Sequence, residues 1–159
     1  KDRLNENDRL QKLRNYVISQ ICNKIPDVII NGPKGYTISP NKIKRLPNNI
    51  NVSFKKVDGN LLLNYLDKMG IYVSTGSACS SKGNGPSHVL ISINCPEEYI
   101  NGSLRISLGK RNTKEDLDYL IKELVSGVRK VRQISRITFD LERIKGSPLD
   151  AGCIKMKSV

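Results

Sequence analysis

The sequence contains no tryptophan and only two phenylalanines, so its core has to be built from aliphatic side chains. Its four cysteines are widely separated and include no Cys-x-x-Cys pair. That spacing predicts reduced thiols in a cytoplasmic protein and argues against a disulfide framework. No signal peptide is recognisable and no apolar run approaches about 18 residues, so we expect a soluble protein. The chain begins at Lys1 without a methionine, and we therefore expect processing or a piece of a longer protein.

The 159 residues suffice for one domain with a hydrophobic core, and they carry a net charge of +12. The densest basic stretch runs from Lys34 to Lys56, with six basic side chains and no acidic one. One interpretation is a surface for an acidic partner or for nucleic acid. The simpler one is a solvated face of a sequence rich in Lys and Asn. We favour the second, because no nucleic-acid motif or aromatic stacking pattern accompanies the charge.

Helical periodicity and strand-like alternation interleave along the chain. The expected helices cover residues 8–24, residues 59–69 with Asp58 as N-cap and Gly70 just beyond the end, residues 86–93, and about 18 residues that follow Thr113 as N-cap. The expected strands cover residues 28–30, 50–54, 71–73 and 103–108. Because the order lacks a strict βαβ rhythm, the sequence predicts an α+β fold in which a short mixed or antiparallel sheet packs against helices. We expect one domain over residues 1–135, and a C-terminal extension over residues 136–159.

One cysteine lies in an unusual setting, in a loop predicted over residues 74–86. Cys79 is surrounded by serines and by Gly76, Gly83 and Gly85. A cysteine of the core is normally flanked by aliphatic residues, because a buried thiol behaves as a small hydrophobe. Glycine and serine instead keep this segment out of regular structure. Cys79 is therefore predicted to be a reachable, mobile thiol, which is what a nucleophile needs.

Three segments together resemble the cysteine desulfurases of the NifS/IscS type, which are pyridoxal-phosphate enzymes of the class V aminotransferase group. The segments are Leu46–Phe54 (LPNNINVSF), Val73–Leu90 with Ser77-Ala78-Cys79-Ser80-Ser81 and Pro86-Ser87-His88-Val89-Leu90, and Gly102–Gly109 (GSLRISLG) followed by Asn112–Asp116 (NTKED). Their order and spacing agree with the family from about Asp8 to about Ser135. The resemblance implies the small C-terminal domain of a fold-type I enzyme.

The resemblance also implies a reaction, in which L-cysteine is converted to L-alanine and its sulfur is left on the loop cysteine as a persulfide. Cys79 would be that nucleophile, and Arg105 would bind the substrate carboxylate. The persulfide would pass to an acceptor or scaffold protein, in iron–sulfur cluster assembly or tRNA thiolation. The full-length enzyme is expected to be a homodimer, and this chain alone to be an inactive monomer.

The sequence contains no Ser-x-His-Lys segment of the kind that anchors the cofactor in this family. Pyridoxal phosphate is therefore expected to be bound mainly by a large domain that this chain does not include, and we assign no cofactor-binding residue here. An alternative is a free-standing persulfide carrier that receives sulfur on Cys79 from another protein.

The remaining candidates are assigned no chemistry. A zinc site formed by Cys79, His88 and Cys95 fails on spacing and on the lack of a fourth ligand. His88 is given no catalytic role, because the acid–base histidine of the family belongs to another domain. Cys22 is expected to pack within its helix, and Cys153 lies in the tail without an assigned role.

Overall fold

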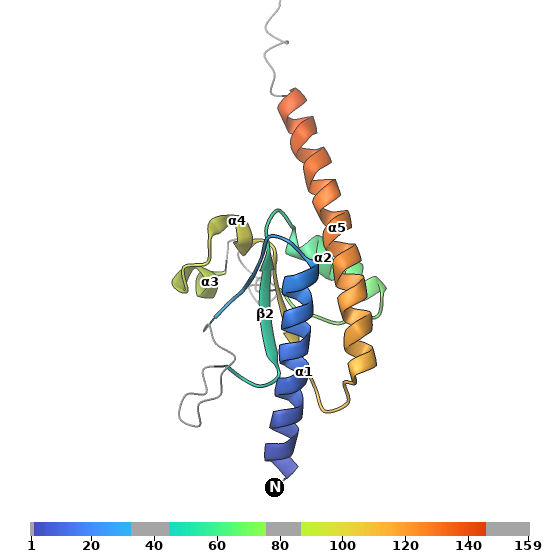
Figure 1. Ribbon diagram of the computed structural model, residues 1–159. Coiled ribbons are helices and arrows are strands. Elements are labelled where there is room, and N and C mark those ends of the chain that lie inside the picture. Colours follow the sequence, from blue (N-terminus) through green and yellow to red (C-terminus); the bar gives the residue numbers. More distant parts are fainter. Residues whose placement is uncertain (1, 33–44, 76–86, 146–159) are drawn as a thin grey trace, which may run out of the picture.

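The structure, a computed structural model, describes residues 2–32, 45–75 and 87–145 (Figure 1). The elements follow in the order α1 (Asp2–Lys24), β1 (Val28–Ile30), β2 (Asn49–Phe54), α2 (Gly59–Lys68), α3 (His88–Ser92), α4 (Glu97–Ile100), β3 (Ser103–Ser107) and α5 (Lys114–Lys145). This arrangement confirms the predicted α+β class. No helix in these ranges combines the length and the apolar character that crossing a membrane requires.

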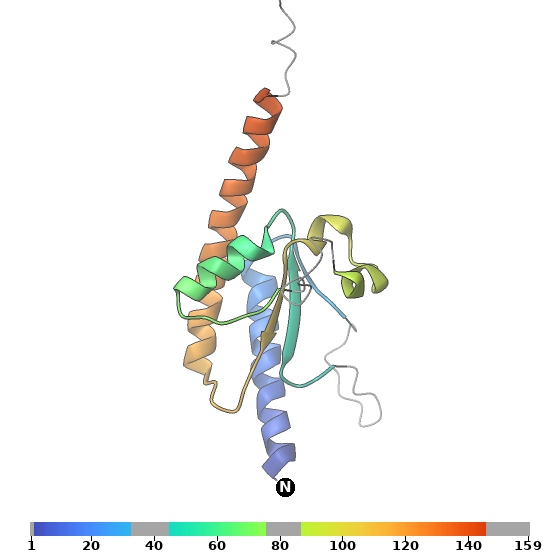
Figure 2. The same ribbon diagram turned by 180° about the vertical axis from the view of Figure 1, so that it is seen from behind.

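The three strands form one antiparallel sheet in the order β1-β2-β3. Helices α1 and α5 lie side by side on one face of this sheet, α2 packs against α5 and β3, and α3 and α4 lie on the other side (Figures 1 and 2). The core lies between the sheet and helices α1, α2 and α5. Its buried side chains are aliphatic apart from Phe54, as the composition predicts. Its fully buried strand residues are Ile50, Val52, Phe54 and Leu104. Alternate residues of β2 and β3 therefore face away from the core, and this second face is polar.

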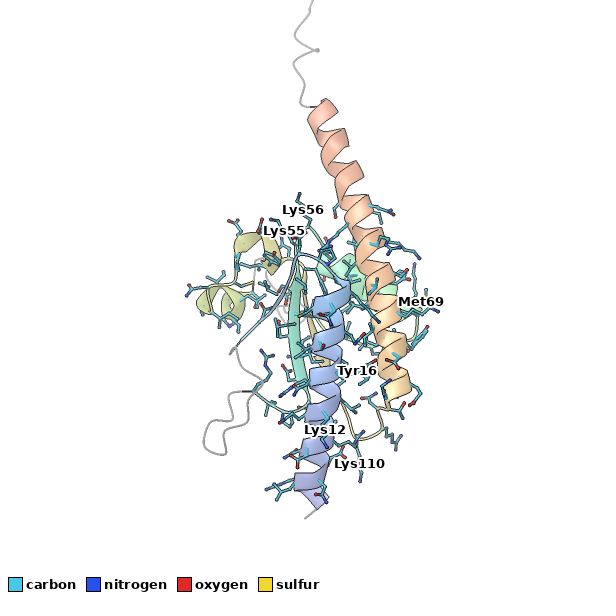
Figure 3. All side chains as sticks on the ribbon, in the orientation of Figure 1. Lys12, Tyr16, Lys55, Lys56, Met69 and Lys110 are labelled. Atoms are coloured by element: carbon cyan, nitrogen blue, oxygen red, sulfur yellow. The ribbon has the colours of Figure 1, made fainter. Side chains whose placement is uncertain are left out.

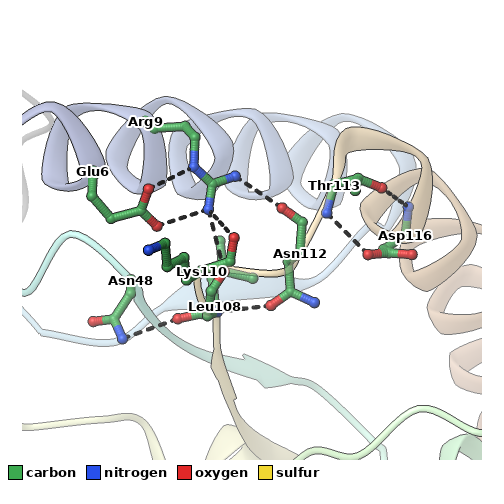
Figure 4. A network of polar contacts seen from close by, with 9 residues as sticks. Glu6, Arg9, Asn48, Leu108, Lys110, Asn112, Thr113 and Asp116 are labelled. Atoms are coloured by element: carbon green, nitrogen blue, oxygen red, sulfur yellow. Dashed lines mark hydrogen bonds and ion pairs between the residues drawn. The ribbon is translucent and has the colours of Figure 1, made fainter. Parts of the chain in front are cut away.

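Two predicted helix caps are confirmed. The Asp58 carboxylate accepts hydrogen bonds from the backbone amides of Asn60 at 2.8 Å and Leu61 at 3.0 Å. At the start of α5, the Thr113 amide donates to the Asp116 carboxylate at 2.9 Å, and the Asp116 amide donates to the Thr113 hydroxyl at 3.3 Å (Figure 4). These reciprocal bonds satisfy amides that a helix N-terminus leaves without partners.

Helix α1 begins earlier than its apolar spacing predicts, at Asp2 instead of Asp8. Its first turns are held by Arg9, which pairs with Glu6 at 2.8 Å and donates to the carbonyl of Asn112 at 2.9 Å (Figure 4). Hydrogen bonds to the loop before α5 thus stabilise a part of α1 that carries little apolar surface.

The expected packing of Cys22 is wrong, since this residue is exposed beside the buried stripe of α1.

The strand predicted over residues 71–73 is absent, and pairing occurs only as an isolated bridge at Ser74. Tyr72 is 84% exposed and therefore does not pack against a neighbouring strand. Without such packing, a β-prone residue is not held in a strand. Conversely, α5 is longer than the predicted 18 residues and continues to Lys145. No glycine or proline interrupts it between Val128 and Lys145, so its backbone runs unbroken past Ser135. The domain boundary at residue 135 stays a prediction.

Gly102 lies where the start of β3 meets the end of β2. A β-carbon at this position would overlap the carbonyl oxygen of Phe54 and lie 3.0 Å from that of Val57. Both neighbours are backbone atoms, and the Phe54 amide also donates to the Gly102 carbonyl at 3.0 Å. No side chain therefore fits here without moving one strand against the other.

Gly102→Ala is expected to lower the free energy of unfolding by about 2 kcal/mol, because the added methyl group forces a backbone shift. Urea unfolding followed by circular dichroism measures the change. Gly109→Ala is the matched control, since the nearest atom to its β-carbon is Asn112 Oδ1 at an ordinary 3.7 Å. Equal stability of the two variants would contradict the proposed backbone contact.

Candidate active site

Arg105 occupies the middle of β3 on the polar face of the sheet. Its side chain is exposed, whereas its neighbours Leu104 and Ile106 point into the core. This is the orientation that the alternation of residues 103–108 predicts. A guanidinium at this position has five N–H donors directed away from the core.

The structure brings Arg105 together with the base of the predicted cysteine loop. The Ser74 amide donates to the Arg105 carbonyl at 3.1 Å, and the Arg105 amide donates to the Ser74 carbonyl at 2.7 Å. Thr75, the next residue, is buried, and its hydroxyl lies 3.5 Å from Asn60 Oδ1. The chain therefore enters the loop from an anchored position beside Arg105. Cys79 itself lies outside the described residues.

A second polar group on the same face escaped the sequence analysis. The Asn31 amino group donates to Asn51 Oδ1 and to the Ser53 hydroxyl, in both cases at 2.7 Å. Asn31 and Ser53 are buried, and Asn51 lies directly opposite Arg105 in the sheet. The alternation of residues 50–54 already placed Asn51 and Ser53 on the face away from the core. The contribution of Asn31 could not be foreseen, because it depends on the pairing of β1 with β2.

The other candidates from the sequence lie elsewhere or in different surroundings. His88 is exposed at the start of α3. In the basic stretch, Arg45 donates to the carbonyl of Asn31, and Lys55 forms an ion pair with Glu98 at 2.9 Å. Each of these cations thus has a partner within the fold. The first part of the stretch, residues 34–44, lies outside the described residues.

Two thiols within the described residues are poorly suited to act as nucleophiles at neutral pH. Partial desolvation raises the pKa of the Cys22 thiol, although this residue is exposed as a whole. Desolvation also raises the pKa of the half-buried Cys95, whose sulfur lies 3.8 Å from the carbonyl oxygen of Pro96. A raised pKa leaves a smaller fraction of thiolate at a given pH, and the thiolate is the reactive form.

We therefore expect iodoacetamide at neutral pH to modify Cys22 and Cys95 more slowly than free cysteine, with both rates increasing as the pH rises above 8. Peptide mass spectrometry of timed samples measures each site separately. Unfolding in urea should bring both rates to that of free cysteine. Alkylation of either residue at the free-cysteine rate in the folded protein would contradict the raised pKa values of these two thiols.

The cofactor implied by the resemblance requires a lysine that forms a Schiff base, which needs a neutral amine in a desolvated site. The lysines of residues 2–32, 45–75 and 87–135 are exposed, apart from the half-buried Lys55; Figure 3 labels Lys55 together with Lys12, Lys56 and Lys110. The ion pair with Glu98 raises the pKa of Lys55, which is the opposite of what a Schiff-base lysine needs. None of the described lysines fits the anchoring role for pyridoxal phosphate.

Comparison with known proteins agrees with the fold and with the predicted family. The family model for class V aminotransferases matches residues 9–120. The chain is 45% identical over 140 residues to "Cysteine desulfurase IscS" of Clostridium botulinum, covering 88% of this chain and 34% of that protein. It is 48% identical over 130 residues to the protein of the same name from Dictyoglomus turgidum, covering 82% of this chain and 31% of that protein.

Two solved structures show the same arrangement. A "NifS-like protein" superimposes with a TM-score of 0.58 at 31% identity, covering 77% of this chain and 28% of that one. A NifS-like protein from Rickettsia africae superimposes with a TM-score of 0.58 at 27% identity, covering 76% of this chain and 28% of that one. The chain belongs to the class V aminotransferase family, whose members are pyridoxal-phosphate enzymes, and the predicted likeness to NifS/IscS proteins is confirmed. It spans about a third of the length of the curated relatives it matches.

Proposed function

We propose that this chain is the part of a cysteine desulfurase that supplies the sulfur-accepting thiol, Cys79, and the substrate-binding arginine, Arg105. The observation that carries this proposal is the pair of backbone hydrogen bonds between Ser74 and Arg105. Five residues of extended chain span at most about 17 Å. A loop that starts at Ser74 therefore keeps Cys79 within reach of a substrate bound to Arg105.

The proposed reaction transfers one sulfur atom. The Cys79 thiolate attacks the sulfur of L-cysteine, so that an S–S bond forms and the C–S bond of the substrate breaks. The electron pair of the broken C–S bond stays with the substrate, whose carbon takes up a proton. The products are therefore L-alanine and a persulfide on Cys79, with no external oxidant or reductant. Arg105 holds the substrate carboxylate through two parallel N–H···O bonds, which fixes the sulfur relative to the loop.

The remaining components are proposed to lie outside this chain. Pyridoxal phosphate supplies an electron sink in reactions of this class, and we place it in the portion of the relatives that this chain does not cover. The persulfide passes to an acceptor protein, the complete enzyme is a homodimer, and its thiol chemistry suits the reducing cytoplasm. Residues 1–135 form the domain, and residues 136–159 extend it.

The test uses two proteins: the one encoded by the complete reading frame that contains this chain, and the 159-residue chain alone. With pyridoxal phosphate, L-cysteine and dithiothreitol, the first should release alanine and sulfide in equal amounts. The second should release neither, but it should still expose a reactive Cys79. Absence of alanine from the first protein, together with sulfur accepted by the 159-residue chain from another desulfurase, would overturn the proposal in favour of a persulfide carrier.

A further inference from the structure

We infer that Asn51 is a second carboxylate-binding residue, which holds the substrate together with Arg105. This inference deepens the proposed function and rests on it for the identity of the ligand. It is carried by a row of polar residues, Asn31, Asn51, Arg105 and Ser74, that crosses the polar face of the sheet from β1 to the base of the loop. Each member is paired with the next through the backbone register.

The register places the side chains of Asn51 and Arg105 close together. Backbone hydrogen bonds join Phe54 to Gly102 and Leu108 to Asn48, and Asn51 pairs with Arg105 between them. In an antiparallel ladder hydrogen-bonded and non-hydrogen-bonded pairs alternate, so Asn51 and Arg105 form a non-hydrogen-bonded pair. The α-carbons of such a pair lie about 4.5 Å apart, and the side chains approach more closely than in the other kind.

Asn31 determines which way the amide of Asn51 points. It donates to Asn51 Oδ1 at 2.7 Å from the β1 side, and it is itself buried and held by a backbone hydrogen bond of 2.9 Å to the Asn51 carbonyl. With its oxygen engaged toward β1, the amide of Asn51 presents its two N–H groups toward β3. The neighbouring side chain on β3 is Arg105.

The two neighbouring side chains therefore present donors and no acceptor. Among the described residues, neither the Arg105 guanidinium nor the Asn51 amino group has a hydrogen-bond partner. Ser74, on the other side of Arg105, directs its hydroxyl to the Thr75 carbonyl at 3.2 Å. A carboxylate has two oxygens with about four acceptor sites, enough for the fork of an arginine and one amide N–H. An anion of this shape satisfies both residues at once.

Asn51→Asp is the sharpest substitution, because it preserves the shape of the side chain and the acceptor for Asn31. The new carboxylate pairs with Arg105 and replaces the bound anion. We expect the affinity for L-alanine, the proposed product, to fall about ten- to a hundredfold. Asn49→Asp is the matched control: it adds the same charge to the same face of β2, but it lies opposite Ser107. The affinity of the Asn49→Asp variant for L-alanine should change by less than about threefold.

The measurement is a titration of the isotope-labelled 159-residue chain with L-alanine, followed by NMR of the side-chain N–H groups of Asn51 and Arg105. Both sets of resonances should shift along one saturating curve, and L-alaninamide, which lacks the carboxylate, should leave them unmoved. A shift at Arg105 without one at Asn51, no shift at either residue, or equal losses in Asn51→Asp and Asn49→Asp would overturn the inference.

Activity provides a separate readout. If the protein from the complete reading frame forms alanine, Asn51→Asp should raise the KM for L-cysteine with little change in kcat, because the carboxylate is bound before and during the reaction. If that protein forms no alanine while the titration succeeds, the proposed function fails and the carboxylate site stands. If alanine forms and the titration fails, the proposed function stands and the inference about Asn51 is wrong.

Discussion

Replacing Cys79 by serine should reduce alanine formation by about a thousandfold or more in the protein encoded by the complete reading frame. A serine hydroxyl can neither form an S–S bond nor ionise near neutral pH, so it cannot accept the substrate sulfur. Binding is expected to survive, because Arg105 holds the carboxylate independently of the thiol. The rate of alanine release, measured with saturating L-cysteine, gives the size of the loss, and the L-alanine titration shows that the binding site persists.

Cys22→Ser and Cys95→Ser are the matched controls for this substitution. Both residues are free thiols within the described part of the chain, and burial raises the pKa of each. Each variant should keep alanine formation within about twofold of the unmodified protein, because a surface or half-buried thiol outside the loop has no part in the transfer. Loss of activity in Cys95→Ser with retention in Cys79→Ser would assign the nucleophile to Cys95 and refute the proposed role of Cys79.

Replacing Arg105 by leucine should weaken binding of L-cysteine and L-alanine about a hundredfold. Two charge-assisted hydrogen bonds to a carboxylate are worth about 3 kcal/mol, which corresponds to that factor. Arg105→Lys should recover part of the loss, because it restores the charge but not the planar fork. The KM for L-cysteine and the L-alanine titration measure the change.

The stability of the fold should not follow the loss of binding at Arg105. Its side chain is exposed on the polar face and makes no hydrogen bond within the described residues, so leucine removes nothing that the fold uses. Urea unfolding of Arg105→Leu should match that of the unmodified chain within about 0.5 kcal/mol. An unchanged KM would show that the carboxylate is bound elsewhere.

The features that the sequence predicted well depend on neighbouring residues. Asp58 and Thr113 cap helices by contacting amides two or three positions away, so the caps could be recognised without knowing the fold. The alternation of β2 and β3 likewise showed which residues face the core, and it placed Arg105 on the opposite face. In each case the interaction that forms the element lies within a few residues.

The features that it predicted poorly depend on distant pairing. Residues 71–73 have the β-prone composition of a strand, yet a strand needs a hydrogen-bonded neighbour, and only Ser74 meets β3. The same long-range bridge brings Ser74, where the predicted loop begins, to Arg105, and no pattern in the neighbouring residues indicates it. Cys79 and Arg105 were assigned roles through the family resemblance, whereas the contact between Asn31 and Asn51 spans twenty residues and emerged only with the sheet register.

The most direct measurement is to locate the transferred sulfur. The protein from the complete reading frame is incubated with pyridoxal phosphate and L-cysteine, its thiols and persulfides are blocked by alkylation, and its peptides are analysed by mass spectrometry. An added sulfur atom is expected on the peptide that contains Cys79, in an amount matching the alanine formed. Alanine formed with the added sulfur on another cysteine, or on none, would contradict the proposed role of Cys79.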